Sequence, residues 1–165
     1  MKRIDRTFLK VCKSFNENGV KYVVCGAYAC KLHGIEEISG HERSTIDYDF
    51  IVEPLEENMK LIKEAFKNFN PEVKELHNSD LKKYQTVKIA GETEIDLIST
   101  LWQINYQKAT QDLIIKEVEG IKIPVLSIDK LISTKKDSFR ERDKADVFWL
   151  NKIKKRNCAS SEKKL

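Results

Sequence analysis

Hydrophobic positions in the first third of the chain follow two different spacings. Apolar residues recur every three or four positions over 3–18 and again over 55–69, which is the spacing of one buried helix face. Between these stretches, residues 20–25 are β-branched and aromatic, as in a buried strand. Residues 46–52 alternate apolar and polar side chains, the pattern of a half-buried strand. The pattern therefore predicts, in chain order, an amphipathic helix, two strands and a second amphipathic helix.

The rest of the chain continues this mixture of helices and strands, while residues 70–83 give no clear pattern. The further elements predicted in chain order are a short helix over 28–33, a loop over 35–45, a hairpin of strands 84–90 and 94–99, a helix over 102–110, a hairpin of strands 113–118 and 121–126, and helices over 128–138 and 141–155. Interspersed helices and strands indicate an α/β (α+β) fold, with a mixed central sheet flanked by helices and further helices at the C-terminal end.

Length and composition favour one soluble domain. The chain has 165 residues, 41% of them hydrophobic and 34% charged, which is enough apolar material for a core without disulfides. We expect a single domain over 1–155 and a basic, flexible tail over 156–165. No apolar run approaches the ~20 residues of a membrane span, and the N-terminus lacks the core of a signal peptide. A cytoplasmic protein without a membrane partner is therefore expected.

Charge and cysteine usage add little to the choice of function. The net charge is +4, and the last fourteen residues hold much of the positive excess. Such a segment is either a solvated helix end followed by disorder or a contact surface for RNA or another polyanion. The four cysteines have no paired spacing and are predicted to be reduced thiols. A zinc site from Cys25, Cys30 and His33 is a weaker alternative, because its spacing does not match a zinc knuckle.

The chemistry of the chain centres on Asp47 and Asp49, which lie two residues apart in the predicted strand 46–52. Side chains two apart in a strand project from the same face, so both carboxylates point the same way. Two like charges this close repel unless a cation lies between them, and Mg²⁺ is commonly held by carboxylates together with substrate phosphates. A solvent-facing acidic strand is the structural alternative.

Two other segments strengthen the metal hypothesis. Gly26 follows a predicted strand and precedes a predicted helix, a setting in which backbone N–H groups can bind a phosphate. Asp96 lies between apolar neighbours in the predicted strand 94–99. Carboxylates on neighbouring strands can hold two Mg²⁺ ions for an in-line displacement at phosphorus, and one acid can accept the proton of the attacking hydroxyl. Together these segments predict phosphoryl chemistry.

The order of these motifs resembles the nucleotidyltransferase superfamily, whose palm is like that of polymerase β. It is most similar to the minimal nucleotidyltransferase and AbiEii-like group, with hydrophobic-Gly-Gly/Ser, then Asp-x-Asp, then a third acid. Further matching segments are Leu32-His33-Gly34, Arg43-Ser44-Thr45-Ile46-Asp47-Tyr48-Asp49, the run 124–132, and Lys135 with the run 140–146. The resemblance covers about residues 8–150.

The resemblance implies a nucleotidyltransferase with two Mg²⁺ ions and an NTP as co-substrate. Asp47 and Asp49 would be ligands of both metals, and Asp96 would be a ligand and the base toward the acceptor hydroxyl. Gly26, Ala27 and Tyr28 would supply backbone amides to the phosphates, although Ala27 and Tyr28 depart from the Gly or Ser of the family pattern.

Three further residues of the matching segments receive weaker predictions. Arg43 and Lys135 are candidate phosphate or base contacts, and solvated loop and helix charges are the alternative reading. His33 is expected to end a helix rather than to act as a base.

Three functions follow from these features. The leading one moves a nucleoside monophosphate from an NTP to a hydroxyl on RNA, a protein or a small molecule and releases pyrophosphate. The second is a glycosyltransferase that holds a nucleotide-sugar through a metal, although such domains are normally longer and need neither the Gly26 turn nor the Asp96 strand. The third is a non-catalytic nucleotide-binding or toxin–antitoxin partner protein, and the family association with such systems also implies an antitoxin-like partner.

Overall fold

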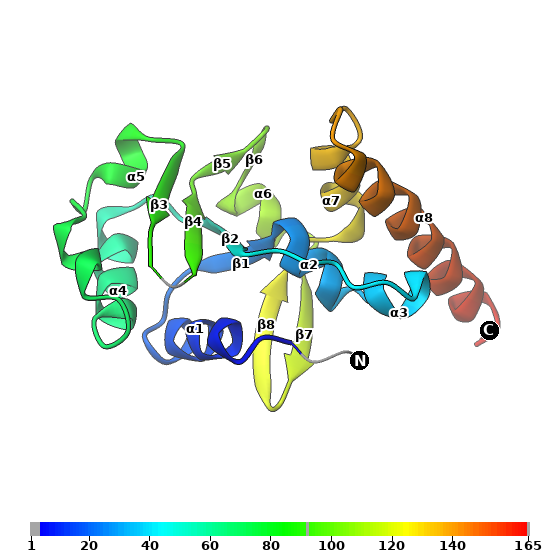
Figure 1. Ribbon diagram of the computed structural model, residues 1–165, viewed down its shortest axis with the longest axis horizontal. Helices are drawn as coiled ribbons and strands as arrows, with labels where there is room; N and C mark the ends of the chain where they lie inside the picture. Colours follow the sequence, from blue (N-terminus) through cyan, green and yellow to red (C-terminus); the bar gives the residue numbers. More distant parts are fainter. Residues whose placement is uncertain (1–3, 92, 165) are drawn as a thin grey trace.

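The computed structural model describes residues 4–91 and 93–164, so predictions at residues 1–3, 92 and 165 lie outside it. Its centre is a six-stranded mixed sheet in the order β3-β4-β2-β1-β8-β7, and a two-stranded ribbon, β5-β6, lies apart from it. Helices flank the sheet, with α4 at one end of the molecule and α8 at the other (Figure 1). The predicted α/β architecture with C-terminal helices is confirmed.

The elements alternate along the chain much as their apolar patterns predict. The helices are α1 (Arg6–Glu17), α2 (Gly26–Leu32), α3 (Ile35–Ser39), α4 (Glu56–Phe66), the 3₁₀ helix η1 (Pro71–Glu75), α5 (Asp80–Lys83), α6 (Tyr106–Thr110), α7 (Ile128–Lys135) and α8 (Glu141–Glu162). The strands are β1 (Tyr22–Cys25), β2 (Asp47–Val52), β3 (Thr86–Ile89), β4 (Glu94–Ile98), β5 (Thr100–Leu101), β6 (Ile104–Asn105), β7 (Ile114–Val118) and β8 (Ile121–Val125).

Strand pairing places β2 in the interior of the sheet. It runs antiparallel to β1 on one side and parallel to β4 on the other. The predicted hairpins are confirmed as the antiparallel pairs β3-β4 and β7-β8. An interior strand has neighbours on both edges, so the backbone of β2 is fixed along its length.

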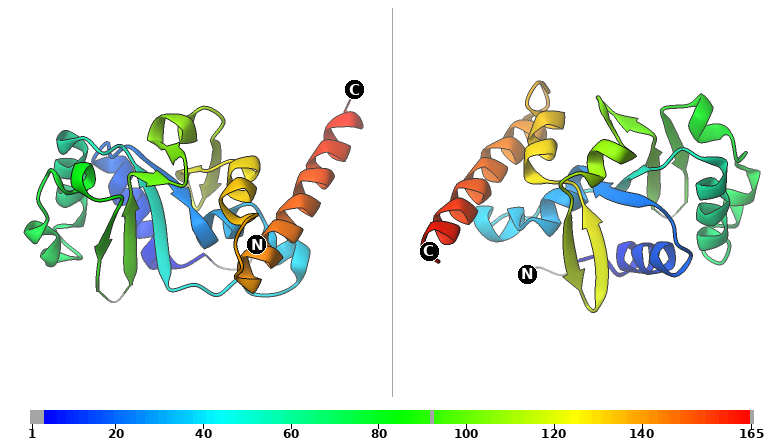
Figure 2. Two further views of the ribbon diagram at one scale, coloured as in Figure 1. Left: turned by 90° about the horizontal axis from the view of Figure 1, so that it is seen from above. Right: turned by 180° about the vertical axis from the view of Figure 1, so that it is seen from behind.

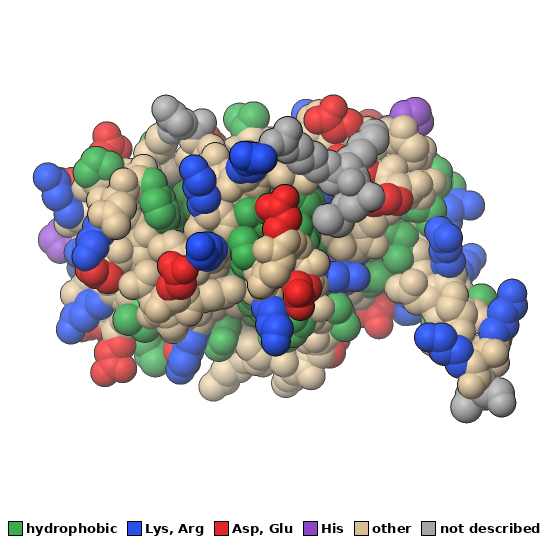
Figure 3. Space-filling model, turned by 90° about the horizontal axis from the view of Figure 1, so that it is seen from below, with side chains coloured by type: hydrophobic (Ala, Val, Ile, Leu, Met, Phe, Trp, Pro, Cys, Tyr) green, Lys and Arg blue, Asp and Glu red, His purple; other side chains and the backbone are tan. Residues whose placement is uncertain are grey.

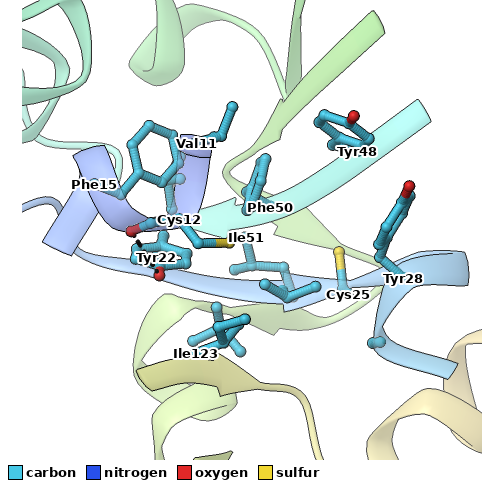
Figure 4. Close-up of a cluster of buried hydrophobic side chains, with 14 of the residues drawn as sticks. Val11, Cys12, Phe15, Tyr22, Cys25, Tyr28, Tyr48, Phe50, Ile51 and Ile123 are labelled. Atoms are coloured by element: carbon cyan, nitrogen blue, oxygen red, sulfur yellow. Dashed lines mark hydrogen bonds between the residues drawn. The ribbon is translucent and has the colours of Figure 1, made fainter. Parts of the chain in front are cut away.

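The core fills the face of the sheet opposite Asp47 and Asp49. Alternate residues of β2, among them Tyr48 and Phe50, point to this face and are fully or almost fully buried. Phe8 of α1 stacks on Phe50 with ring centroids 6.1 Å apart. Phe15 meets Phe50 edge to face, with ring centroids 5.2 Å apart (Figure 4). The apolar stripe of α1 therefore covers this side of the sheet, as its periodicity predicts.

Two predicted segments differ from the structure. Residues 35–45 were expected to be a loop, but Ile35–Ser39 form α3. Its Glu36 is 5% exposed and accepts a hydrogen bond from the Arg43 backbone N–H at 2.8 Å, so the acid is buried with a partner rather than solvated. Residues 102–110 were expected to be one helix, but the ribbon β5-β6 precedes a short α6.

The C-terminal helix is longer than predicted. Helix α8 runs to Glu162, so residues 156–162, expected in a flexible tail, are helical. Figures 2 and 3 show that its C-terminal part projects from the rest of the molecule and carries Lys and Arg side chains. No helix among the described residues has the length and apolar character needed to cross a membrane.

Candidate active site

One row of paired residues crosses four neighbouring strands of the sheet. Lys88 of β3 pairs with Asp96 of β4, Asp96 with Asp49 of β2, and Asp49 with Cys25 of β1. Paired residues project from the same face, on strands ~4.8 Å apart. Asp47 lies two residues before Asp49 and shares this face. The prediction that the three acids gather on one face is confirmed, and we call Asp47, Asp49 and Asp96 the acidic cluster.

The carboxyl of Asp49 lies in the most unfavourable position of the cluster. Burial, followed by the neighbouring charges of Asp96 and Asp47, raises the pKa of Asp49 to about 7. Lys135 and Lys88 act in the opposite direction but do not restore the ordinary value of 3.8. The protein thus holds a carboxyl whose ionised form is poorly compensated by its own cations, which is the electrostatic setting that a bound divalent cation relieves.

The other two acids also retain capacity for a ligand. Oδ1 of Asp47 is buried and has no hydrogen-bond partner among the described residues. Lys88 Nζ lies 3.1 Å from Oδ1 and 3.2 Å from Oδ2 of Asp96, donating to Oδ2, but the Lys88 side chain is 65% exposed. Within residues 4–91 and 93–164, no three His, Cys, Asp or Glu side chains are already arranged around a metal position.

Gly26 contacts the acidic cluster directly. Its φ of +65° is in the left-handed region, and a Cβ at this position would lie 2.2 Å from Oδ2 of Asp49. Glycine is therefore required here for two reasons, backbone conformation and the close approach of the Asp49 carboxylate. The sequence predicts close approach of a phosphate at this turn, whereas the structure shows that the nearest neighbour is a carboxylate.

The two residues after Gly26 belong to the core rather than to the open side of the sheet. Ala27 is 7% exposed, and the ring of Tyr28 stacks on Phe8 with centroids 4.3 Å apart. Figure 4 shows Tyr28 beside Tyr48, on the buried side of β2. The ring of Tyr28 therefore does not face the cleft side of the sheet, and the predicted contact of Tyr28 through its backbone N–H stays a prediction.

An open cleft of about 720 Å³ lies over Asp49 and Asp96. This volume is within the ~300–1,000 Å³ range of small-molecule sites. The residues that line it are Cys25, Gly26, Asp49, Thr86, Asp96, Ile98, Leu101, Trp102, Thr134, Lys135, Asp137, Ser138, Phe139, Arg140 and Asp143. Asp49 and Asp96 thus face a space large enough for a nucleotide, whereas Asp47 is not among the residues that line it.

Arg43 and Lys135 are not the solvated charges of the alternative reading, because both pair with buried Asp146 of α8. Arg43 donates to both Asp146 oxygens, at 2.8 and 3.0 Å. Lys135 Nζ lies 3.0 Å from Asp146 and 2.9 Å from Asp143. Asp146 is 1% exposed, so these ion pairs attach α8 to α7 and to the segment before β2. Lys135 also lines the cleft, whereas Arg43 does not.

His33 ends helix α2, as predicted. Its Nε2 lies 2.8 Å from the backbone oxygen of Leu126, and burial lowers its pKa. This contact joins α2 to the segment after β8, and His33 is not among the residues that line the cleft.

Sequence reasoning missed several residues of the site. Lys88 gave no signal because a lone lysine in a strand is ordinary, although its period-two position relative to Val87 and Ile89 already indicated the open face. Asp143 and Asp146 fell inside a segment quoted only for its resemblance. Trp102 and Phe139 were not considered as site residues.

Comparison with known proteins identifies no family. No protein-family model matches the chain, and no curated protein is significantly similar to it.

Proposed function

We propose that this protein is a Mg²⁺-dependent nucleotidyltransferase that moves a nucleoside monophosphate from an NTP to a hydroxyl acceptor. The observation that carries the proposal is the pairing of Asp49 with Asp96 on neighbouring strands, on the floor of an open cleft and beside Asp47. The resemblance of the motif order to the nucleotidyltransferase superfamily supports the same reaction.

The residues of the acidic cluster fit a hard cation. Carboxylate oxygens are the ligands that Mg²⁺ prefers, and Oδ1 of Asp47 is buried without a partner. Asp47 and Asp49 would hold the metal together with phosphate oxygens of the NTP, and Asp96 would complete the set. When bound, Mg²⁺ supplies positive charge to the phosphates and to the leaving pyrophosphate.

The remaining steps belong to side chains of the protein. Asp96 would accept the proton of the acceptor hydroxyl, which is the role of a general base. Lys88 contacts Asp96, and its side chain, 65% exposed, would offer its ammonium to a phosphate bound in the cleft. Lys135 lines the cleft and adds positive potential near the phosphates while its ammonium stays paired with α8.

The test measures metal binding and turnover separately. Binding of a non-hydrolysable NTP should require Mg²⁺, and label from an α-³²P NTP should appear on one member of a pooled set of RNA, protein and small-molecule acceptors. Asp47→Asn, Asp49→Asn and Asp96→Asn should each lose transfer. Asp129→Asn, whose side chain is 64% exposed at the start of α7, is the matched control and should keep it. Unchanged binding and transfer in the three cluster variants would refute the proposal.

A second candidate function is nucleotide binding without transfer. It is favoured by the Lys88–Asp96 ion pair, which already neutralises the proposed base, and by Ala27, which offers no hydroxyl to a phosphate oxygen. Mg²⁺-dependent NTP binding without release of pyrophosphate would select this function.

A further inference from the structure

Two large aromatic side chains line the same cleft as Asp49 and Asp96 and remain exposed to solvent. Trp102 lies in the turn between β5 and β6 and is 62% exposed. Phe139 lies in the connection between α7 and α8 and is 95% exposed. The β5-β6 ribbon and the α7–α8 connection both lie along the upper side of the molecule in Figure 1. The two rings thus come from segments that are distant in sequence.

Packing within the described chain explains neither ring. The core aromatics contact one another, whereas neither Trp102 nor Phe139 contacts another ring among the described residues. Burial of a large apolar side chain is favourable, so exposure of two such rings on one cleft is characteristic of a binding surface.

The backbone at Trp102 also gives no reason for an indole. Its φ is +55°, in the left-handed region that glycine and asparagine adopt readily and bulky residues rarely do. A turn of this shape would be more stable with glycine. The side chain of Trp102 is therefore held at the tip of the ribbon despite the backbone preference, which indicates a role for the ring itself.

We propose that Trp102 and Phe139 form a stacking site for a nucleobase of the substrate. This inference rests on the proposed function, because the acidic cluster would hold the phosphates of the same substrate complex. Aromatic rings bind any nucleobase through its π face, and indole is among the strongest stacking partners. The base belongs either to the NTP or to an unpaired end of an RNA acceptor, and the experiment separates these sources.

The experiment uses fluorescence of the full chain in a Trp149→Phe background. The sequence contains two tryptophans, so this background makes Trp102 the only fluorophore of its kind. Three probes are titrated in Mg²⁺: a non-hydrolysable ATP analogue, a single-stranded RNA with a free 3′ hydroxyl and no triphosphate, and inorganic tripolyphosphate, which has no base. Quenching by the analogue assigns the base to the NTP, and quenching by the RNA assigns it to the acceptor. Tripolyphosphate should bind without quenching.

Variants of both rings test the contribution to affinity by calorimetry. Trp102→Gly relieves the left-handed backbone and so should fold normally, and Phe139→Ala removes a ring that contacts almost nothing. Each should weaken binding of the base-bearing probe by about tenfold or more while leaving tripolyphosphate unaffected. Tyr84→Ala removes an equally exposed ring, at 60%, that does not line the cleft and is the matched control.

The outcomes separate this inference from the proposed function. If neither base-bearing probe quenches Trp102, and Trp102→Gly and Phe139→Ala bind both as the wild type does, the stacking site is refuted. Mg²⁺-dependent tripolyphosphate binding that is lost in Asp49→Asn would leave the proposed function standing in that case. Tripolyphosphate binding that is insensitive to Mg²⁺ and to Asp49→Asn would refute the proposed function itself.

Discussion

Asp49→Asn should stabilise the metal-free protein, and the gain should grow with pH. The folded protein raises the pKa of Asp49 from 3.8 to about 7, mainly by burial and then by Asp96 and Asp47. Each pKa unit is worth ~1.4 kcal/mol, so the ionised carboxylate costs the folded state up to ~4 kcal/mol relative to the neutral form. Asparagine has nearly the same shape and no charge, so the variant avoids this cost.

The sign of the pH dependence follows from the raised pKa. Below about pH 3.8 Asp49 is neutral in both the folded and the unfolded chain, and the variant should match the wild type. Between about pH 4 and 7 the unfolded chain releases this proton and the folded chain keeps it, so wild-type stability falls as pH rises. Above about pH 7 the loss is complete, and the variant should exceed the wild type by up to ~4 kcal/mol.

Urea unfolding in EDTA at several pH values between 4 and 8 measures this difference directly. Asp129→Asn is the control, because its exposed ion pair with Lys154 should give a small, nearly constant effect. Adding Mg²⁺ should stabilise the wild type at pH 8 and not the Asp49→Asn variant. A variant that is less stable than the wild type at pH 8 in EDTA would show that Asp49 is a favourably paired structural acid, and the electrostatic reasoning would fail.

Three more changes test other parts of the structure. Gly26→Ala should lower the free energy of unfolding by at least ~1–2 kcal/mol and abolish Mg²⁺-dependent stabilisation, because the added methyl group meets Asp49 and the backbone is left-handed. Thermal melts with and without Mg²⁺ measure both effects. Asp146→Asn should destabilise the folded protein by ~3–5 kcal/mol, the opposite sign to Asp49→Asn, because Arg43 and Lys135 then face a buried site without its charge. Urea unfolding measures the change, and an unchanged free energy of unfolding would contradict the prediction. Alkylation of the native protein should modify Cys158 and spare the three buried thiols, as peptide mapping would show, whereas fast modification of a second cysteine would contradict the burial.

The sequence predicted the acidic cluster because its signal is local. The alternation around Asp47 and Asp49 determines which face each side chain takes, and the apolar neighbours of Asp96 do the same on the next strand. Pairing of the two strands then brings the acids together. Period-two patterns thus predict which face of the sheet a side chain takes. That the strands of Asp49 and Asp96 are neighbours was predicted from the order of the motifs and not from periodicity.

The sequence analysis gave wrong or incomplete predictions for residues whose contacts in the structure are with residues far away along the chain. The partner of Arg43 is 103 residues away at Asp146, so a local reading offered a phosphate contact or a solvated charge and missed the buried ion pair. The sequence around Glu36 predicts a loop, but in the structure the Glu36 carboxylate contacts the Arg43 backbone N–H and the Lys31 ammonium. For Tyr28 the sequence predicted only a role of the backbone N–H, and it gave no indication that the ring packs on Phe8 in the core.

Helix α8 consists of two segments that differ in local stability. Up to Ile153 it packs on the rest of the protein, whereas every described residue after Ile153 is exposed. The distal segment cannot unfold the domain when it frays, because it contributes almost no buried surface. It also avoids the nucleation step of an isolated peptide, since the packed turns before it already form a helical template. Amide hydrogen exchange along α8 should therefore accelerate residue by residue from about Lys154, and stepwise deletion from that end should reduce helicity without lowering the midpoint of unfolding.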